Sequence, residues 1–217
     1  MHDAFVLGRR RPRTEFWSGT TVVGGPVAPG PFEFRRNEVS PGRLAPKAVY
    51  AFDGVVADGA QFDLTDVVLT IQRSAFSACR FVQKRRRASD GTGGSGSLAR
   101  HASVYRECVF EGVRFRVRGG FSVGAARFER CTFIRCDFGE HFSFCADHID
   151  CTFVGPVKRA VFYGQAPEGH HCDGKRNVFE GNDFTEAVLH DVGFRGGIDA
   201  TLQRWREGFD PTPFMNA

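Results

Sequence analysis

The chain has 217 residues, of which 41% are hydrophobic and 25% charged, with a formal net charge of +4. This length fits one domain or one solenoid and allows a substantial buried core. No apolar stretch approaches the ~20 residues of a membrane span, and the arginine-rich N-terminus lacks the apolar run of a signal peptide. We therefore expect a soluble, cytoplasmic protein that does not bind membranes.

Two residue types stand out in the composition. The chain contains 23 phenylalanines but only 2 tryptophans and 2 methionines, which indicates a core that repeats one position many times. The seven cysteines are an odd number. Five of them share one small-residue position of the repeat described below: Cys79, Cys108, Cys131, Cys136 and Cys151. We interpret these five as buried small hydrophobes rather than disulfide partners, which favours a reducing compartment.

Residues 1–49 form the N-terminal basic segment. They are rich in Arg, Pro and Gly, and Thr20–Val23 is one of few strand-like patches. Gly-Pro and Pro-Gly pairs interrupt anything longer. We predict a short strand or hairpin that caps the open end of the following solenoid, because an uncovered end would expose both core and strand edge.

A five-residue period dominates the sequence from residue 50 onward. Phe128, Phe133 and Phe138 recur at this step, and an alanine or cysteine lies two positions before each. A helix repeats every 3.6 residues and a strand every 2, so neither element explains the period. The pattern therefore indicates a repeat architecture.

The repeat resembles that of the pentapeptide-repeat family, in which Ala or Cys, Asn or Asp, and Leu or Phe precede two polar residues. Asn182–Glu186 and Ala187–Asp191 fit this pattern well, as do the Cys-Thr-Phe runs at 131–133 and 151–153. The resemblance covers roughly residues 50–81 and 105–199. It implies an all-β fold, a right-handed quadrilateral parallel β-helix in which each pentapeptide forms one side of a square coil.

The central residues of the repeat are expected to stack inside this coil. Neighbouring rungs lie roughly 4.8 Å apart, so each ring would contact the ring of the next rung. Burial of each ring contributes on the order of 1.5–3 kcal/mol before conformational entropy is subtracted. The predicted core ladder consists of Phe110, Phe115, Phe128, Phe133, Phe138, Phe153, Phe179, Phe184, Leu189 and Phe194.

Two insertions are predicted within the β-helix of residues 50–199, at about 82–104 and 154–176. The first begins with four consecutive basic residues, Lys84, Arg85, Arg86 and Arg87. These residues are our candidate partner-binding loop, and the alternative is a solvated charged loop without a partner. The following Gly91–Gly96 matches G-x-G-x-x-G by letter, but it lacks the strand and helix of a phosphate site and is interpreted as a linker.

Residues 200–217 are predicted to form a short C-terminal helix and a tail. Asp199 is a suitable N-cap, and Leu202 and Trp205 would then lie on one side of the helix and cover the last coil. The resemblance implies that this end joins two copies of the chain into a homodimer.

The sequence shows no motif for catalysis, a metal or a cofactor. Cys131, Cys136 and His141 share the spacing of the core, where a dication has neither room nor charge compensation. His170–Asp173 lies in the second insertion without a spaced zinc-ligand partner. No serine or cysteine is near a recognisable base, so we predict a non-enzymatic protein.

The function follows from the resemblance. The best-known activity of the family is protection of DNA gyrase and the related topoisomerase, in which an acidic dimeric β-helix acts as a DNA mimic. The resemblance thus implies a self-resistance or antibiotic-resistance role with a type II topoisomerase as protein partner. The candidate acidic face is Glu180, Asp183, Glu186 and Asp191, although the other repeats are nearly charge-balanced. The alternative is a scaffold or adaptor that binds an unrelated partner through its basic loops; direct binding of nucleic acid is left open.

Overall fold

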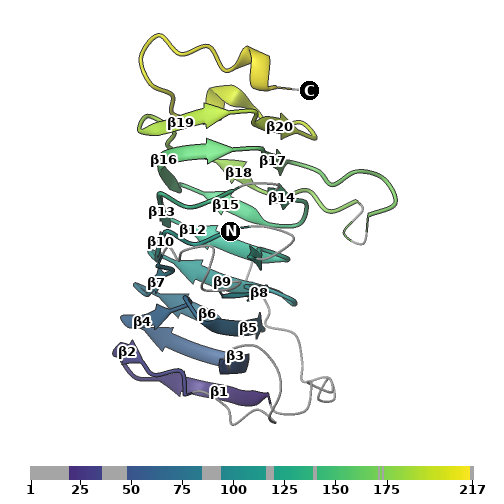
Figure 1. The fold of residues 1–217 in the computed structure, drawn as a ribbon. Helices are drawn as coiled ribbons and strands as arrows, with labels where there is room; N and C mark the ends of the chain where they lie inside the picture. The colour runs from purple at the N-terminus through teal and green to yellow at the C-terminus, as the bar shows by residue number, and fades with distance from the viewer. Residues whose placement is uncertain are drawn as a thin grey trace, which may run out of the picture.

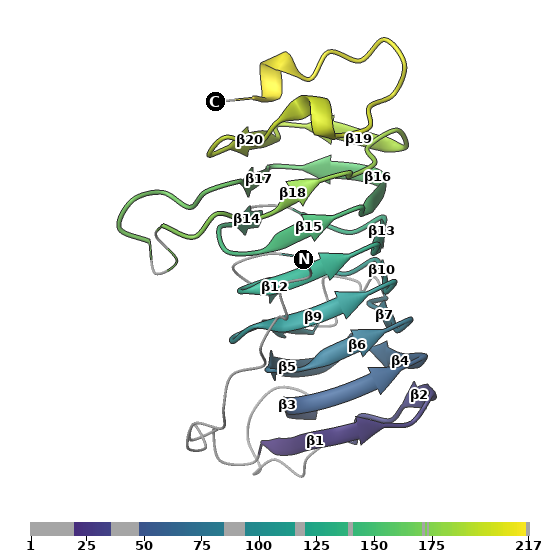
Figure 2. The same cartoon turned by 180° about the vertical axis from the view of Figure 1, so that it is seen from behind.

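The computed structural model describes residues 20–35, 48–84, 94–115, 120–138, 141–170, 172 and 174–215. Its short strands stack along one axis, from β1 at one end to β20 near the other (Figures 1 and 2). Pairing between the named strands is parallel throughout. The chain is therefore an all-β parallel solenoid, as predicted, while the right-handed quadrilateral form of the coil stays a prediction.

The strands form three sheets along this axis. The ten-stranded sheet contains β1 (Thr21–Val27), β3 (Ala48–Asp58), β5 (Val67–Gln72), β6 (Ala75–Ser77), β8 (Ser95–Ser97), β9 (Ser103–Arg106), β11 (Phe121–Ser122), β12 (Ala126–Glu129), β15 (Asp147–Ile149) and β18 (Phe179–Glu180). The seven-stranded sheet contains β2 (Gly30–Phe32), β4 (Ala60–Asp63), β7 (Arg80–Val82), β10 (Val109–Glu111), β13 (Thr132–Ile134), β16 (Thr152–Lys158) and β19 (Ala187–His190). The third sheet contains β14 (His141–Ser143), β17 (Ala160–Tyr163) and β20 (Gly193–Arg195).

A column of stacked phenylalanine rings runs through the core. Consecutive ring centroids along it are 4.6–5.2 Å apart, and the rings are nearly parallel. The column consists of Phe62, Phe81, Phe110, Phe133, Phe153 and Phe184. The structure buries every residue of the predicted ladder except Leu189, which is half-buried. Aromatic pairs at this spacing add to the free energy of area burial.

A second column contains residues that are not phenylalanine. Tyr105 stacks between Phe76 and Phe128, at centroid distances of 5.0 and 5.1 Å. Its hydroxyl donates a hydrogen bond to the carbonyl of Leu98, which satisfies the buried polar atom. The next ring is that of His148, 5.2 Å from Phe128. The core therefore accepts any flat ring at this position of the repeat.

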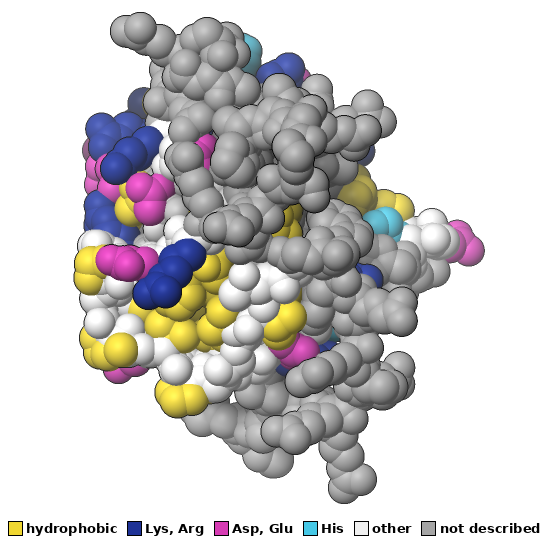
Figure 3. Space-filling view, turned by 60° about the horizontal axis from the view of Figure 1, so that its bottom comes forward, with side chains coloured by type: hydrophobic (Ala, Val, Ile, Leu, Met, Phe, Trp, Pro, Cys, Tyr) yellow, Lys and Arg dark blue, Asp and Glu magenta, His cyan; other side chains and the backbone are white. Residues whose placement is uncertain are grey.

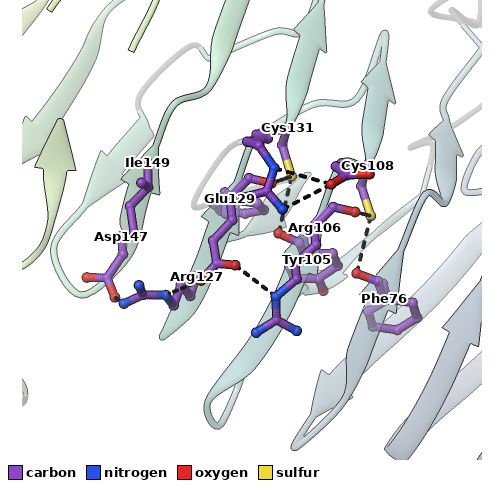
Figure 4. A network of polar contacts seen from close by, with 12 residues as sticks. Phe76, Tyr105, Arg106, Cys108, Arg127, Glu129, Cys131, Asp147 and Ile149 are labelled. Carbon is purple, nitrogen blue, oxygen red and sulfur yellow. Dashed lines mark hydrogen bonds and ion pairs between the residues drawn. The ribbon is translucent and has the colours of Figure 1, made fainter. Parts of the chain in front are cut away.

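Four cysteines of the repeat, Cys79, Cys108, Cys131 and Cys151, form a column of thiols beside the rings, of which Figure 4 labels Cys108 and Cys131. Cys108 Sγ donates to the Phe76 carbonyl at 3.6 Å, and Cys131 Sγ donates to the Tyr105 carbonyl at 3.3 Å. Burial raises the pKa of the Cys131 thiol, and the hydrogen bond from Cys131 raises that of Cys108. These thiols stay protonated, in keeping with their interpretation as small hydrophobes.

The residue before the small position turns each corner with a positive φ. Arg130, Arg135 and Asp150 have φ values of 52°, 47° and 52°. Gly112 and Gly181 occupy the same position on other rungs, with φ values of 64° and 67°. Because this conformation costs a non-glycine residue roughly 1–2 kcal/mol, the packing of the ring and thiol columns must offset it at each such corner.

Both insertions are shorter than the sequence indicated. Residues 94–104, assigned to the first insertion, include β8, which pairs with β5. Gly96 is required there because a Cβ would lie 1.9 Å from the Leu69 carbonyl oxygen, so the glycines serve close stacking rather than flexibility. In the second insertion, β16 and β17 continue the coil, and the excursion begins only at Gly164.

Residues 20–35 extend the ladder at the N-terminal end instead of folding back as a hairpin. β1 pairs in parallel with β3, and β2 pairs in parallel with β4. Phe32 packs against the core from this first rung. Viewed from this end, hydrophobic side chains are visible among the polar ones (Figure 3). Residues 1–19 and 36–47 of the predicted N-terminal segment lie outside the described residues.

The predicted C-terminal helix is wrong in type. The described residues after β20 contain two single 3₁₀ turns, η2 (Ala200–Leu202) and η3 (Thr212–Phe214). Asp199 caps the first of them by accepting the Thr201 N–H. The chain here continues the coil, and Arg204 forms an isolated parallel bridge with Asp183. The extended path of this bridge is incompatible with a continuous helix.

The two residues predicted to cover the last coil behave differently. Leu202 is 51% exposed and does not cover it. Trp205 does lie over the last rings, because its indole stacks on Phe184 at 5.0 Å. Its Nε1 donates to the Ala200 carbonyl at 2.9 Å, which fixes the orientation of the indole.

Candidate functional site

The predicted basic loop is described only at its first residue. The Lys84 ammonium lies 3.4 Å from the Asp63 carboxylate and is largely exposed. Exposed pairs of this kind contribute little to stability. Arg85, Arg86 and Arg87 lie outside the described residues, so the loop stays a prediction.

Charged side chains on the middle rungs neutralise one another across rungs (Figure 4). The Glu129 carboxylate accepts from Arg106 at 2.8 Å and from Arg127 at 2.6 Å. Arg127 also reaches Asp147, at 3.4 Å. Partial burial opposes ionisation of Glu129, but the hydrogen bonds from the two arginines outweigh it and lower the pKa of this carboxyl.

Other acids of the same rungs are paired in the same way. Glu107 binds Arg130 at 3.0 Å, and Glu111 pairs with both Arg80 and Arg135. The middle of the solenoid therefore presents alternating charges of both signs. Such a surface differs from the continuous row of negative charges along a DNA duplex.

The acids of the last rungs lack this compensation. Glu180, Glu186 and Asp191 are exposed, and no lysine or arginine of the described chain lies within ion-pair distance of them. Asp183, the fourth predicted residue, pairs with Arg204 at 3.1 Å. Burial raises the pKa of Asp183, but hydrogen bonds from Thr185 and the charge of Arg204 lower it overall, so it stays ionised.

A cavity of about 770 Å³ opens beside the coil at the base of the second excursion. Ser97 and residues 99–102 and 122–125 line it from the coil, and His141, Cys145, His170 and Lys175 line it from the later rungs and the excursion. Its lining therefore combines apolar coil residues with titratable side chains.

Two cysteines outside the repeat position meet at this cavity. Cys145 and Cys172 form a disulfide, with their Cα atoms 6.0 Å apart. His170 Nδ1 lies 3.0 Å from Cys172 Sγ and 4.0 Å from Cys145 Sγ. Sequence reasoning missed this cluster because 27 residues separate the two cysteines. The available signal was that neither cysteine has a phenylalanine two positions later, as each of the other five has.

Hydrogen bonds fasten the base of the excursion to the coil. Lys175 Nζ donates to the Cys145 carbonyl at 2.6 Å and to the Asp147 carboxylate at 3.2 Å. Asn177 Nδ2 donates to the carbonyls of Phe144 and Tyr163, at 2.7 and 2.8 Å. The sulfur atoms and the imidazole are thus held on a rigid frame.

Two buried histidines lie in the core near the cavity. His141 and His148 are 2% and 1% exposed. Burial lowers the pKa of each to about 3, so both are neutral at physiological pH. Among the described side chains, none bonds to His141 Nε2 or to the Ser143 hydroxyl. Both neutral rings pack against aromatic residues of the core, His141 against Phe138 and His148 against Phe128.

Comparison with known proteins gives distant likenesses only. No family model and no curated protein matches the chain. Among solved structures, a trypsin-treated form of QnrB1, a plasmid-mediated fluoroquinolone resistance protein, is similar at 12% identity with a TM-score of 0.30, covering 87% of this chain and 93% of that chain. Full-length QnrB1 is similar at 15% identity with a TM-score of 0.23, covering 87% of this chain and 94% of that chain. These TM-scores are too low to carry information on function.

No helix in the described part of the chain has the length and hydropathy needed to span a bilayer.

Proposed function

We propose that the protein is a non-enzymatic binding protein whose acidic C-terminal rungs dock on a basic surface of a protein partner. One observation carries the proposal: acids of the middle rungs are paired with arginines, whereas Glu180, Glu186 and Asp191 have no such partner among the residues that the structure describes. Carboxylates without a counter-charge produce a negative potential that steers and orients a basic partner. Their rigid frame keeps the ordering cost of binding low.

Type II topoisomerase, DNA gyrase in particular, is the partner that we propose first. The five-residue motif supports this choice through its resemblance to the pentapeptide-repeat family. Enzymes that bind DNA present basic surfaces to its phosphates, and an acidic protein surface can occupy such a site. Because the charge of the middle rungs is balanced, we place the DNA-like contact at the C-terminal end only. The role would be protection of the enzyme, as in self-resistance or antibiotic resistance.

A binding role agrees with the chemistry of the described core. Cys131 and Cys108, two of the repeat cysteines, stay protonated because burial raises the pKa of the first thiol and a hydrogen bond with the neighbouring thiol raises that of the second. The buried histidines are neutral and enclosed by aromatic rings. A nucleophile needs an accessible, ionised or base-activated group, and these residues provide none.

The test is the affinity of purified DNA gyrase for the wild-type protein and for two triple variants. The acidic-end variant carries Glu180→Gln, Glu186→Gln and Asp191→Asn. The control removes three exposed carboxylates elsewhere, with Glu33→Gln, Asp58→Asn and Glu168→Gln. Loss of three contributions of about 0.5–1 kcal/mol each predicts roughly tenfold or greater weakening for the first variant and less than twofold for the second.

Two results would overturn this proposal. Equal affinity of gyrase for both variants would show that the acidic rungs are not part of the interface. Absence of wild-type binding would remove gyrase as partner. In that second case, a partner captured from lysate that is lost when Lys84 to Arg87 are changed to Gln would favour the adaptor alternative.

A further inference from the structure

The cluster formed by Cys145, His170 and Cys172 combines the two side-chain types that bind zinc most often. One donor atom of each residue lies within 4.8 Å of the others. Cys145 is 4% exposed, while His170 and Cys172 are half-buried, so the cluster opens toward solvent on one side. Thiolate sulfur and imidazole nitrogen are the preferred ligands of Zn²⁺ in proteins.

We infer that, once the Cys145–Cys172 disulfide is reduced, these two thiolates and His170 Nδ1 bind one Zn²⁺. The excursion is then held to the coil by a sulfur–sulfur bond under oxidising conditions and by a metal ion under reducing conditions. This inference is independent of the proposed function, because it concerns different residues and a different ligand.

The geometry of the imidazole fits a tetrahedral ion. Zn–S and Zn–N bonds of about 2.3 and 2.05 Å place sulfur and nitrogen ligands about 3.6 Å apart. The His170 Nδ1 distances to Cys172 Sγ and Cys145 Sγ, 3.0 and 4.0 Å, bracket this value. The two sulfurs need a separation of about 3.8 Å around the same ion, which becomes available once their bond is broken.

The surroundings hold the ligands in place in either redox state. The ring of Phe144 packs against that of His170, with centroids 4.2 Å apart. Lys175 Nζ binds the Cys145 carbonyl, so the backbone of this ligand stays fixed when the disulfide opens. Its ammonium and the Arg100 guanidinium also line the cavity, and nearby cations favour the thiolate form of cysteine.

Three protein ligands leave one position of a tetrahedral zinc ion open. The adjoining cavity of about 770 Å³ has room for a water molecule or a small anion at that position. The two thiolates neutralise the charge of the ion, which the dry aromatic core cannot do. For this reason the cluster, and not the thiol column, is the place for a metal.

The reaction balances in two steps. Two molecules of a low-molecular-weight thiol reduce the disulfide, giving two cysteine thiols and one oxidised disulfide of the reductant. Zn²⁺ then displaces both thiol protons as it binds, so two protons are released for each ion. Exchange with the oxidised disulfide of the reductant reverses the sequence: it takes two electrons from the two thiolates, re-forms the protein disulfide, releases two molecules of the reduced thiol once they take up two protons, and expels the metal.

The experiment measures zinc binding by the full chain in both redox states. A water-soluble phosphine reduces the disulfide, is itself converted to its oxide with oxygen from water, and is removed by gel filtration without air. Zn²⁺ is then titrated against a chromophoric chelator, with proton release followed in weak buffer. We expect one Zn²⁺ per reduced chain, about two protons released, and no binding by the oxidised chain. Co²⁺ should give thiolate-to-metal charge-transfer absorption in the reduced chain.

Variants separate this site from the other cysteines. Cys172→Ser and His170→Ala should each weaken Zn²⁺ binding at least about tenfold, while Cys136→Ala, which changes a buried cysteine of the repeat, should leave it unchanged. Circular dichroism reports whether each protein is folded. If reduction unfolds the chain, added Zn²⁺ should restore the fold, and failure to do so overturns the inference. Absence of binding by the folded reduced chain, or wild-type affinity in Cys172→Ser, also overturns it.

Discussion

Cys131 illustrates why the small position of the repeat stays small. Its sulfur lies 3.3 Å from the Tyr105 carbonyl oxygen of the preceding rung, and its side chain is fully buried. A longer side chain has no space between two rungs at strand spacing. The five-residue period therefore reflects two steric demands, a ring toward the axis and a small residue at the corner.

Truncation of a ring in the column should be costly. Phe133 stacks on Phe110 and Phe153, at 5.2 and 4.9 Å, and rungs on both sides prevent the void from collapsing. We expect Phe133→Ala to lower the free energy of unfolding by about 3–5 kcal/mol and Cys131→Leu to lower it by about 1–3 kcal/mol through overpacking. Urea denaturation measures both, and midpoints equal to wild type would show that the repeat phase is misassigned.

The buried histidines should make the fold sensitive to acid. The pKa of His148 is lowered by burial to about 3 from an ordinary value of 6.5, so its contribution to stability is complete above pH 6.5. As pH falls from 6.5 toward 3, the unfolded chain binds the proton first, and stability falls by about 1.4 kcal/mol per pH unit for each such group.

A matched variant isolates this effect. His148→Phe places another ring between Phe128 and Phe179, in the same register, and removes one of the two buried imidazoles. The melting temperature of this variant should fall less between pH 6.5 and 4 than that of wild type. Identical pH dependence in the two proteins would show that burial does not lower the pKa of His148 in the folded chain.

At the scale of the element, the corners carry a conformational cost that can be relieved. Arg159 lies between β16 and β17 with a φ of 52°, and its side chain is exposed. Glycine removes a penalty of roughly 1–2 kcal/mol there and adds about 0.5–1 kcal/mol of unfolded-state entropy. We expect Arg159→Gly to raise the free energy of unfolding by about 0.5–1 kcal/mol. The neighbouring Lys158→Gly, in an extended strand, should lower it, and destabilisation by both would contradict the corner assignment.

How much of each element the sequence predicts depends on whether its residues keep the five-residue phase. The rings from Phe128 to Phe153 keep it, so this part of the stacked coil is predictable from spacing alone. β8 cannot be predicted in this way. Its Gly96 is needed because the Leu69 carbonyl of another rung leaves no space for a Cβ atom, and no local sequence pattern reveals this contact. The Cys145–Cys172 cluster was equally hidden, since the fold, and not a motif, brings the two cysteines together.

At the C-terminus, sequence reasoning failed for a different reason. Helical spacing predicts that Leu202 and Trp205 lie on one side of a helix. The described chain there instead continues the coil and contains only single 3₁₀ turns. Trp205 lies 21 residues after Phe184 and continues its ring column, which is the spacing of one further rung. The repeat, rather than an amphipathic helix, explains this residue.

For the whole molecule, the homodimer stays a prediction. The structure shows that residues of the chain itself cover part of the surface through which the two copies would join. Phe209 stacks on Trp205 at 5.6 Å and Phe214 stacks on Phe209 at 5.6 Å, so the chain partly covers its own last rung. If two copies nevertheless join through this end, Trp205→Ala should shift wild-type dimers to monomers in sedimentation velocity. A wild-type monomer would remove the dimer and leave Trp205 as a cap.

The distribution of charge along the axis connects the fold to the proposed function. Arginines on adjacent rungs neutralise Glu107, Glu111 and Glu129, while the last rungs keep exposed acids. The charge of the solenoid is thus asymmetric along its axis, with the exposed acids at the C-terminal end. A basic partner should therefore bind at that end. Binding should weaken as salt concentration rises, because the interface consists of exposed charges.

Drug-induced DNA cleavage by gyrase tests this account most directly. Gyrase, DNA and a fluoroquinolone are incubated with increasing wild-type protein, with the acidic-end variant, or with the control variant, and cleaved DNA is quantified. We predict that the wild type and the control reduce cleavage over the same concentration range and that the Glu180, Glu186 and Asp191 variant requires roughly tenfold more. Unchanged cleavage at micromolar excess of the folded wild-type protein would contradict the account.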